Sequence, residues 1–325
     1  MVRTGLLLLA RVPVLALLWA CSSGASPPTA GSGALRIAAM GPAAAEMLDS
    51  LGLLDNVVGV GDFFDWPPAV RSLPRLGPFS APNAERVLGL RVNLLVTSRS
   101  AAASPSITRL RDLGVRVLEL ETSTYEGTLA SIVELGRAVG KEREARAVEQ
   151  QIRARMAALA RRAATVARRR VLFVVGRDPL YVAGPGSHID EMITAAGGEN
   201  IAHDATSAYQ LASVEAMLER MPEVIVDISE NRPGALRGRE NGSWGQWSFL
   251  PAVAAKRVYW VDPDRLSIPG PRLPDMTELL ARMIHPEIFG APAPGELGPF
   301  ESPAPARRGA APAGSAAATT PAGTP

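Results

Sequence analysis

The chain has little of the chemistry from which disulfide scaffolds and metal sites are built. Its 325 residues include one cysteine, Cys21, and three histidines. A single cysteine cannot form an internal disulfide. His188, His203 and His285 are dispersed, whereas a zinc site needs clustered His or Cys at ligand spacing. We therefore expect no disulfide framework and no metal site of the protein's own.

Two common α/β enzyme motifs are also missing. An α/β hydrolase needs Gly-x-Ser-x-Gly after a strand, and residues 184–188, Gly-Pro-Gly-Ser-His, lack that frame. Dinucleotide binding needs Gly-x-Gly-x-x-Gly at the first strand–helix turn, which residues 40–43 do not supply. The sequence therefore gives no support for catalysis. The alternative hypothesis, that the protein is a secreted α/β hydrolase-like enzyme, has no supporting motif.

Lysine is nearly absent, since Lys141 and Lys256 are the only lysines among 34 basic residues. The sequence also has 32 acidic residues, which gives a formal net charge of +2. The arginines are scattered among carboxylates, without the aromatic-interleaved basic stripe that nucleic-acid binding needs. We expect no nucleic-acid partner.

The first 21 residues have the order of a secretory signal peptide, in which Arg3 precedes an apolar run that ends shortly before Cys21. Arg11 interrupts this run, and a stable membrane span needs about 20 mainly apolar residues. A removed signal is therefore favoured over a retained helix. Cys21 follows a small residue and resembles a lipoprotein processing site. This predicts a periplasmic or cell-surface protein held to a membrane by a lipid anchor alone.

Two segments lack the apolar residues that a fold needs. Residues 22–34 are almost wholly Ser, Gly, Ala, Pro and Thr, and residues 291–325 are rich in Ala, Pro and Gly. Such compositions cannot bury enough apolar surface to offset the entropy of ordering. We expect a flexible tether and a disordered tail around a folded part, residues 35–290.

An approximate repeat within the folded part predicts two similar lobes. Residues 81–97 and 212–227 each have the pattern of a short helix followed by a buried strand. Glu85 and Glu215 both fall in the first helical turn, where the helix dipole favours a negative charge. Further strands and helices alternate, as in open parallel α/β sheets. Strands are expected at 35–40, 57–60, 115–120, 171–175 and 257–261, and helices at 43–51, 106–113, 189–196 and 275–284.

The stretch between the two halves of the repeat is rich in helix formers. Residues 141–167 contain no Gly or Pro, and as one helix they would span roughly 40 Å. A single crossing of this kind predicts a stiff connection. It divides the folded part into an N-terminal lobe at 35–140, a backbone helix at 141–167 and a C-terminal lobe at 168–290.

A series of short motifs, in order and spacing, resembles the helical-backbone substrate-binding proteins of ABC importers for cobalamin, ferric siderophores and haem. The motifs lie at 58–60, 65–68, 76–77, 83–87, 182–187, 195–201, 214–215 and 270–273. The resemblance covers residues 35–289. It implies two Rossmann-like α/β lobes with parallel sheets, joined by one long helix, with a ligand cleft between the lobes and little hinge motion.

The resemblance also implies binding without catalysis. The expected role is capture of cobalamin or a related corrinoid, with a ferric siderophore or haem as the alternatives. The partners would be an ABC permease dimer and its ATPase. The protein itself is expected to be monomeric and to need no cofactor beyond the ligand that it carries.

In the cobalamin-binding branch, aromatic side chains of both lobes pack against the corrin ring. The matching positions are Trp66 and Phe79 in the first lobe and Tyr181 and Tyr209 in the second. A planar macrocycle has large apolar faces, and one aromatic side chain can bury 150 to 250 Å². The alternative is that these are ordinary core aromatics.

Further ligand contacts are expected from a loop and from two arginines. Trp244 and Trp247 lie in a Gly-rich loop, where exposed aromatics usually serve contact, so they are candidates for the cleft rim. Arg272 by resemblance, and Arg99 beyond a strand end, offer planar forks of donors for a ligand carboxylate or amide. Either arginine could equally be a surface charge.

Glu85 and Glu215 resemble the glutamates that dock such proteins onto arginines of the permease. One glutamate in each lobe suits a two-lobed protein that faces a dimeric permease. Exposed pairs of this type provide orientation and encounter rate more than affinity. The alternative is a purely local role at the two helix starts.

Overall fold

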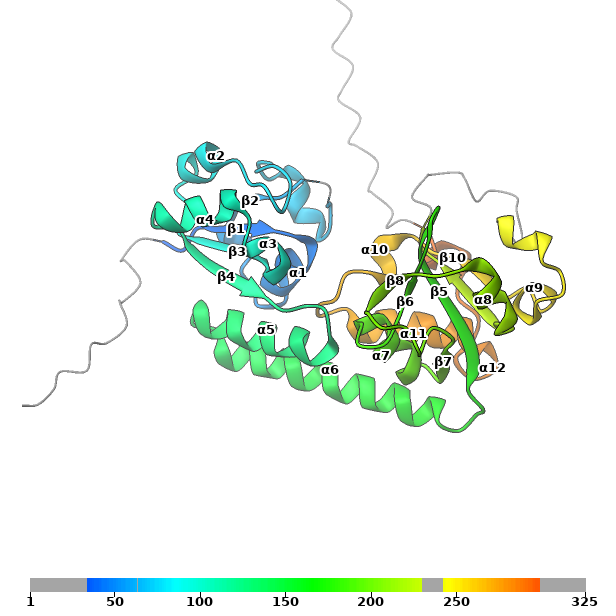
Figure 1. Ribbon diagram of the computed structural model, residues 1–325. Coiled ribbons are helices and arrows are strands. Elements are labelled where there is room, and N and C mark those ends of the chain that lie inside the picture. Colours follow the sequence, from blue (N-terminus) through cyan, green and yellow to red (C-terminus); the bar gives the residue numbers. More distant parts are fainter. Residues whose placement is uncertain (1–33, 63, 230–241, 299–325) are drawn as a thin grey trace, which may run out of the picture. The chain divides into compact units, whose positions relative to one another are not determined.

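Two α/β lobes make up the computed structural model, which describes residues 34–62, 64–229 and 242–298 (Figure 1). The N-terminal lobe holds strands β1 to β4 and the C-terminal lobe holds strands β5 to β10. The predicted signal peptide with Cys21, most of the predicted tether, and the predicted tail beyond residue 298 lie outside the described residues.

The N-terminal lobe is built on a four-stranded parallel sheet in the order β2-β1-β3-β4. Its inner strands are buried along their length, as expected for a sheet covered on both faces. The strands are β1 (Ile37–Met40), β2 (Val57–Val60), β3 (Leu94–Ser98) and β4 (Arg116–Leu120).

Helices cover both faces of this sheet. Residues of α1 (Pro42–Ser50) and α5 (Tyr125–Ala138) pack on one face, and residues of α2 (Ala84–Gly89) and α4 (Pro105–Asp112) pack on the other. Shorter turns complete the lobe. They are η1 (Leu54–Asn56), η2 (Pro68–Ser72) and α3 (Arg99–Ala102).

The C-terminal lobe has a mixed sheet in the order β10-β9-β5-β6-β8, with β7 also paired to β5. The prediction of a parallel sheet is wrong here, because β6 runs antiparallel to both β5 and β8. Only two residues, Asp178 and Pro179, connect β5 to β6, and so short a link can join only antiparallel strands. The strands are β5 (Arg169–Arg177), β6 (Leu180–Ala183), β7 (Gly198–Asn200), β8 (Tyr209–Leu211), β9 (Val224–Asp227) and β10 (Val258–Trp260).

The helices of this lobe also form two layers. Residues of α7 (His188–Ala195) and α11 (Leu273–Ile284) join one apolar core, and residues of α8 (Val214–Glu219) and α9 (Pro251–Ala254) join another. The remaining elements are η3 (Gly242–Gln246), α10 (Pro263–Leu266), α12 (Pro286–Phe289) and η4 (Pro294–Glu296). Residues 291–298 were expected in the disordered tail, but the Leu297 carbonyl accepts a hydrogen bond from the Asp262 N–H at 2.8 Å.

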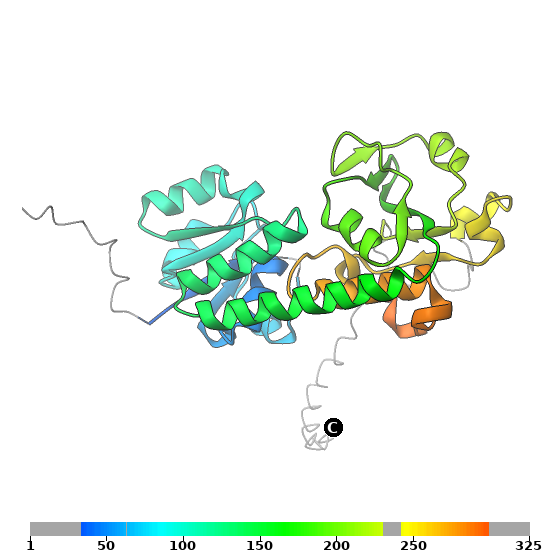
Figure 2. The ribbon, with the colours of Figure 1, turned by 90° about the horizontal axis from the view of Figure 1, so that it is seen from below.

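The long helix α6 runs from Glu142 to Ala163 and is 22 residues long. It ends four residues before the predicted boundary, where the Thr165 hydroxyl donates to the Arg162 carbonyl and β-branched Thr165 and Val166 disfavour another turn. Figure 2 shows α5 and α6 side by side. Helix α6 also contacts the C-terminal lobe, where Arg155 of α6 pairs with Asp275 of α11 at 2.6 Å. Within the described ranges, no helix has both the length and the apolar character needed to cross a bilayer.

The close approach of α5 and α6 depends on Gly136. A Cβ at this position would collide with the Cβ of Ala145 and lie 2.9 Å from the Lys141 carbonyl oxygen. We predict that Gly136→Ala lowers the free energy of unfolding by about 1–3 kcal/mol, as overpacking does in tight contacts. Urea unfolding measures this, with Gly89→Ala as the control, because a Cβ at Gly89 meets nothing within 4 Å. Equal stability of the two variants would contradict the tight contact.

Candidate functional site: a pocket between the lobes

The carboxyl ends of β3 and β4 bring two polar loops to one edge of the N-terminal sheet. In parallel α/β sheets this edge is where ligands usually bind. Ser98 ends β3 and is followed by Arg99 and Ser100, while β4 is followed by Thr122 and Ser123. Short hydroxyl side chains and one guanidinium therefore gather at this edge.

These loops form one wall of a pocket of about 260 Å³. The two lobes belong to one compact unit that begins at Leu35, and the C-terminal lobe supplies the other wall. The lining residues are Ser98, Arg99, Ser100, Leu120, Thr122, Ser123, His188, Tyr209 and Pro269. We call this cavity the seam pocket.

Two backbone amides tie the lobes together beside the seam pocket. The His188 N–H at the start of α7 donates to the Ser123 carbonyl at 2.9 Å. The Tyr125 N–H at the start of α5 donates to the Glu191 carboxylate at 2.6 Å. Both donors belong to first helical turns, whose N–H groups have no partner within their own helix. The seam between the lobes thus satisfies two helix starts at once.

A buried ion pair makes a third contact between the lobes. Glu46 of α1 is almost completely buried and accepts from the Arg272 Nε at 2.9 Å, with a second contact from Nη2. Burial raises the pKa of Glu46, and the Arg272 guanidinium offsets part of that shift. The guanidinium also lies over the Trp66 ring, 5.6 Å from its centroid. Arg272 and Trp66, both expected to bind ligand, are therefore in contact with each other, and Arg272 is itself part of this ion pair.

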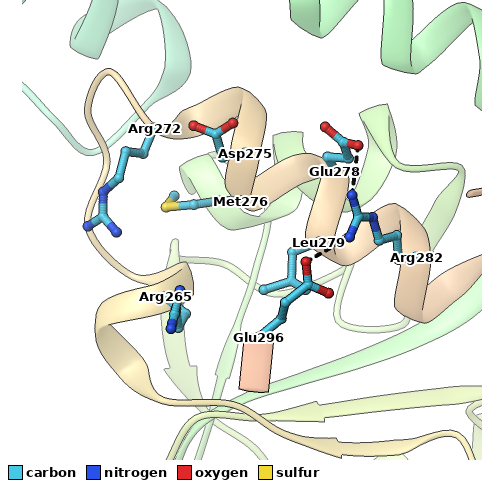
Figure 3. A pocket seen from close by; sticks show the side chains of 8 residues that line it. All are labelled: Arg265, Arg272, Asp275, Met276, Glu278, Leu279, Arg282 and Glu296. Atoms are coloured by element: carbon cyan, nitrogen blue, oxygen red, sulfur yellow. Dashed lines mark hydrogen bonds and ion pairs between the residues drawn. The ribbon is translucent and has the colours of Figure 1, made fainter. Parts of the chain in front are cut away.

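Arg272 also lines a second cavity of about 310 Å³ beside α11, drawn in Figure 3. The charged side chains that line this cavity pair with one another, since Arg282 reaches Glu278 at 3.1 Å and Glu296 at 2.8 Å. This cavity is less suited than the seam pocket to a ligand with large apolar faces.

The predicted tyrosines of the C-terminal lobe share one exposed face. Tyr181 of β6 pairs in register with Leu211 of β8, and Tyr209 pairs with Ala183. Because side chains alternate along a strand, Tyr181, Tyr209 and Leu211 lie on the same side of this ribbon. Tyr209 is 42 % exposed and lines the seam pocket. An apolar face that is open to solvent therefore adjoins the pocket.

The other predicted contacts fall in different places. Arg99 lines the seam pocket and pairs with Glu121 at 3.1 Å. Phe79 is 52 % exposed on the loop before α2, and it is not among the described residues that line the pocket. Trp66 is half-buried.

The expectation of an exposed Trp244 is wrong. Its indole is 2 % exposed and donates from Nε1 to the buried Asp227 carboxylate at 2.9 Å. Arg177 also pairs with Asp227, at 3.0 Å, and lies over the Trp244 ring. A buried carboxylate needs donors, so Trp244 packs in the core. Trp247 is half-buried against it, with 5.3 Å between ring centroids.

His188 and the serines that line the pocket were not among the predicted site residues. His188 is only 3 % exposed, and burial lowers its pKa to about 4. The available signal was its position after Gly-Pro-Gly-Ser, where a helix begins with Ser187 as its N-cap. That pattern predicts a helix start but does not indicate which surface the imidazole meets.

Glu85 and Glu215 occupy equivalent positions, which confirms the predicted repeat. Each is exposed in the first turn of a six-residue helix, α2 or α8, that leads into a strand, β3 or β9. The Ser213 hydroxyl donates to Glu215 at 2.7 Å and lowers the pKa of this carboxyl. Both carboxylates are accessible to a partner.

Residues 37–265 match the family model described as periplasmic binding protein. The chain belongs to this family. A cobalamin-binding protein of Halobacterium salinarum is 31% identical over 82% of this chain and 75% of its own length. An uncharacterized ABC transporter substrate-binding lipoprotein of Bacillus subtilis is 30% identical over 78% of this chain and 81% of its own length.

Solved structures of the family share the fold. A periplasmic heme-binding protein from Pseudomonas aeruginosa superposes with a TM-score of 0.67 at 28% identity, covering 78% of this chain and 93% of its own. The two-lobed α/β architecture is therefore that of the periplasmic binding proteins. Substrate-binding proteins of ABC importers, as the Bacillus subtilis relative is described, interact with a permease and its ATPase.

Breaking the Glu46–Arg272 pair should destabilise the protein. Removing one partner leaves the other charge buried and uncompensated, so Arg272→Ala should lower the free energy of unfolding by about 3–5 kcal/mol. The double variant Glu46→Met with Arg272→Met should recover much of this loss, because no buried charge remains.

Chemical denaturation measures both variants. The control is Arg111→Ala, which breaks the exposed pair of Arg111 and Glu119 and should cost at most about 1 kcal/mol. If Arg272→Ala were as mild as this control, the ion pair would not hold the lobes together.

Proposed function

We propose that this protein is the lipid-anchored substrate-binding component of an ABC importer that captures cobalamin or a related corrinoid between its lobes. The observation that carries the proposal is the exposed face of Tyr181, Tyr209 and Leu211 beside the seam pocket. An apolar wall next to a pocket that contains hydroxyls and an imidazole suits a macrocycle with flat faces and polar side arms. The printed name of the Halobacterium relative supports the choice of ligand.

The size of the seam pocket limits how such a ligand could bind. Its volume of about 260 Å³ is below the 300–1,000 Å³ of sites that enclose a drug-sized ligand. Only part of a corrinoid would enter it, and the ring faces would rest on aromatic side chains outside it. Phe79 supplies such a surface in the N-terminal lobe.

Haem is the second candidate, and a ferric siderophore the third. The Pseudomonas structure with the same fold is a heme-binding protein, and Tyr209 places a phenol at the seam pocket. A siderophore would need a strongly cationic site, whereas Arg99, the only arginine among the described residues that line the pocket, is paired with Glu121.

Export and anchoring complete the proposed role. The signal-like segment before Cys21 would be removed and Cys21 acylated, leaving the lobes tethered at a membrane surface. The Bacillus relative is described as a lipoprotein, which supports this. The carrier would be monomeric and would release its ligand unchanged.

Ligand titration tests the proposal. We predict that the purified protein binds cyanocobalamin with a Kd below 1 µM, equivalent to a binding free energy of about −8 kcal/mol or stronger. Haemin and ferric siderophores should bind far more weakly. Tyr209→Ala should weaken binding about tenfold through lost ring contact. The control is Leu113→Ala, which truncates an exposed apolar side chain of α4's C-cap and should leave affinity unchanged. Binding of haemin alone would favour the second candidate, and binding of none would overturn the proposal.

Permease docking is tested separately. We predict that Glu85→Arg combined with Glu215→Arg abolishes ligand uptake by the reconstituted importer and leaves ligand affinity intact, because the reversed charges repel arginines of the permease. The control replaces Glu134 and Glu199, which are also exposed, by Arg, and uptake should persist. Loss of ligand binding in the Glu85 and Glu215 variant would count against a docking role.

A further inference from the structure

The seam pocket contains a polar side chain that no described residue satisfies. His188 is 3 % exposed, and neither Nδ1 nor Nε2 makes a hydrogen bond of acceptable length and angle within the described part of the chain. Its backbone N–H is already bonded to the Ser123 carbonyl. An unsatisfied buried polar group costs stability, so the free protein gains nothing from a histidine over an apolar ring here.

Several other polar groups around the pocket have partners inside the protein. The hydroxyls of Ser98 and Ser100 bond to each other at 3.0 Å, and Arg99 and Ser123 both bond to Glu121. Burial lowers the pKa of His188 to about 4, and the neighbouring Ser123 carbonyl offsets only part of that shift. At neutral pH the imidazole is uncharged, with one N–H donor and one acceptor nitrogen.

We infer that the seam pocket is a subsite for a carbonyl-bearing side arm of the ligand, and that the His188 imidazole N–H donates to that carbonyl. The inference rests on the proposed function and deepens it. A volume of about 260 Å³ corresponds to about eight or nine groups the size of a water molecule. A short amide or carboxylate arm fits this space, whereas the macrocycle does not.

The unsatisfied imidazole in the pocket favours such an arm. A hydrocarbon arm would leave both imidazole nitrogens unsatisfied, so the site would discriminate against ligands without a carbonyl at this position. Corrinoid amide arms and porphyrin carboxylate arms share this acceptor. Cyanocobalamin and haemin therefore serve as the two probes, one for each source of the carbonyl.

The test compares His188→Phe, which keeps a planar ring but removes the donor, with His188→Gln, which keeps a donor. We predict that His188→Phe weakens cyanocobalamin binding about tenfold, while its thermal midpoint stays the same or rises because a buried unsatisfied group has gone. His188→Gln should bind within about threefold of the parent protein. His203→Phe, a change at an exposed histidine, is the matched control and should alter neither property.

The outcomes separate this inference from the proposed function. If the parent protein binds neither probe, the proposed function fails and the subsite fails with it. If His188→Phe binds every probe that the parent protein binds with unchanged affinity, only the subsite is overturned. If affinity and thermal midpoint fall together in both His188 variants, the histidine is structural and the inference is again overturned. A loss confined to haemin binding would assign the subsite to a carboxylate arm.

Discussion

Two hydrogen bonds from backbone amides fix the seam on which the pocket depends. The amides of His188 and Tyr125 each begin a helix in one lobe and donate to an acceptor in the other, Ser123 or Glu191. Helix starts carry N–H groups that need external partners, so meeting that need also aligns the lobes. The pocket walls are therefore set by helix geometry before any ligand arrives, which reduces the ordering cost of binding.

The two lobes contribute different chemical groups to the pocket. The edge of the N-terminal sheet supplies hydroxyls and one guanidinium, while the C-terminal lobe supplies an apolar ribbon and a buried imidazole. The two exposed glutamates, Glu85 and Glu215, lie on repeated helix–strand units, one in each lobe.

Much of the fold could be predicted from the sequence, because buried parallel strands have short apolar runs and long helices lack Gly and Pro. The strands around residues 37–40 and 94–98 and the helix from residue 142 follow from such local patterns. The antiparallel β6 could not be identified in the same way. Its apolar residues, 180–183, have no periodicity that separates it from a parallel strand, and its direction is set by the two-residue turn before it.

The site was less predictable, because its members depend on contacts distant in sequence. Tyr209 and Arg99 were expected at the pocket and do line it. The environment of Trp244 is set by Asp227, a buried carboxylate that takes the indole N–H into the core. His188 meets a surface built from residues about 65 to 90 positions earlier in the chain, and no local pattern around it could indicate this.

The claim that the seam pocket exists before the ligand binds is tested most directly by amide hydrogen exchange at His188 and Tyr125 in the ligand-free protein. Amides held by stable hydrogen bonds exchange only through opening, with free energies up to that of global unfolding. We predict that both amides exchange slowly in the free protein and that cyanocobalamin adds little further protection. Exchange at unprotected rates without ligand, slowed only when ligand is added, would show that the ligand assembles the pocket and would contradict the account.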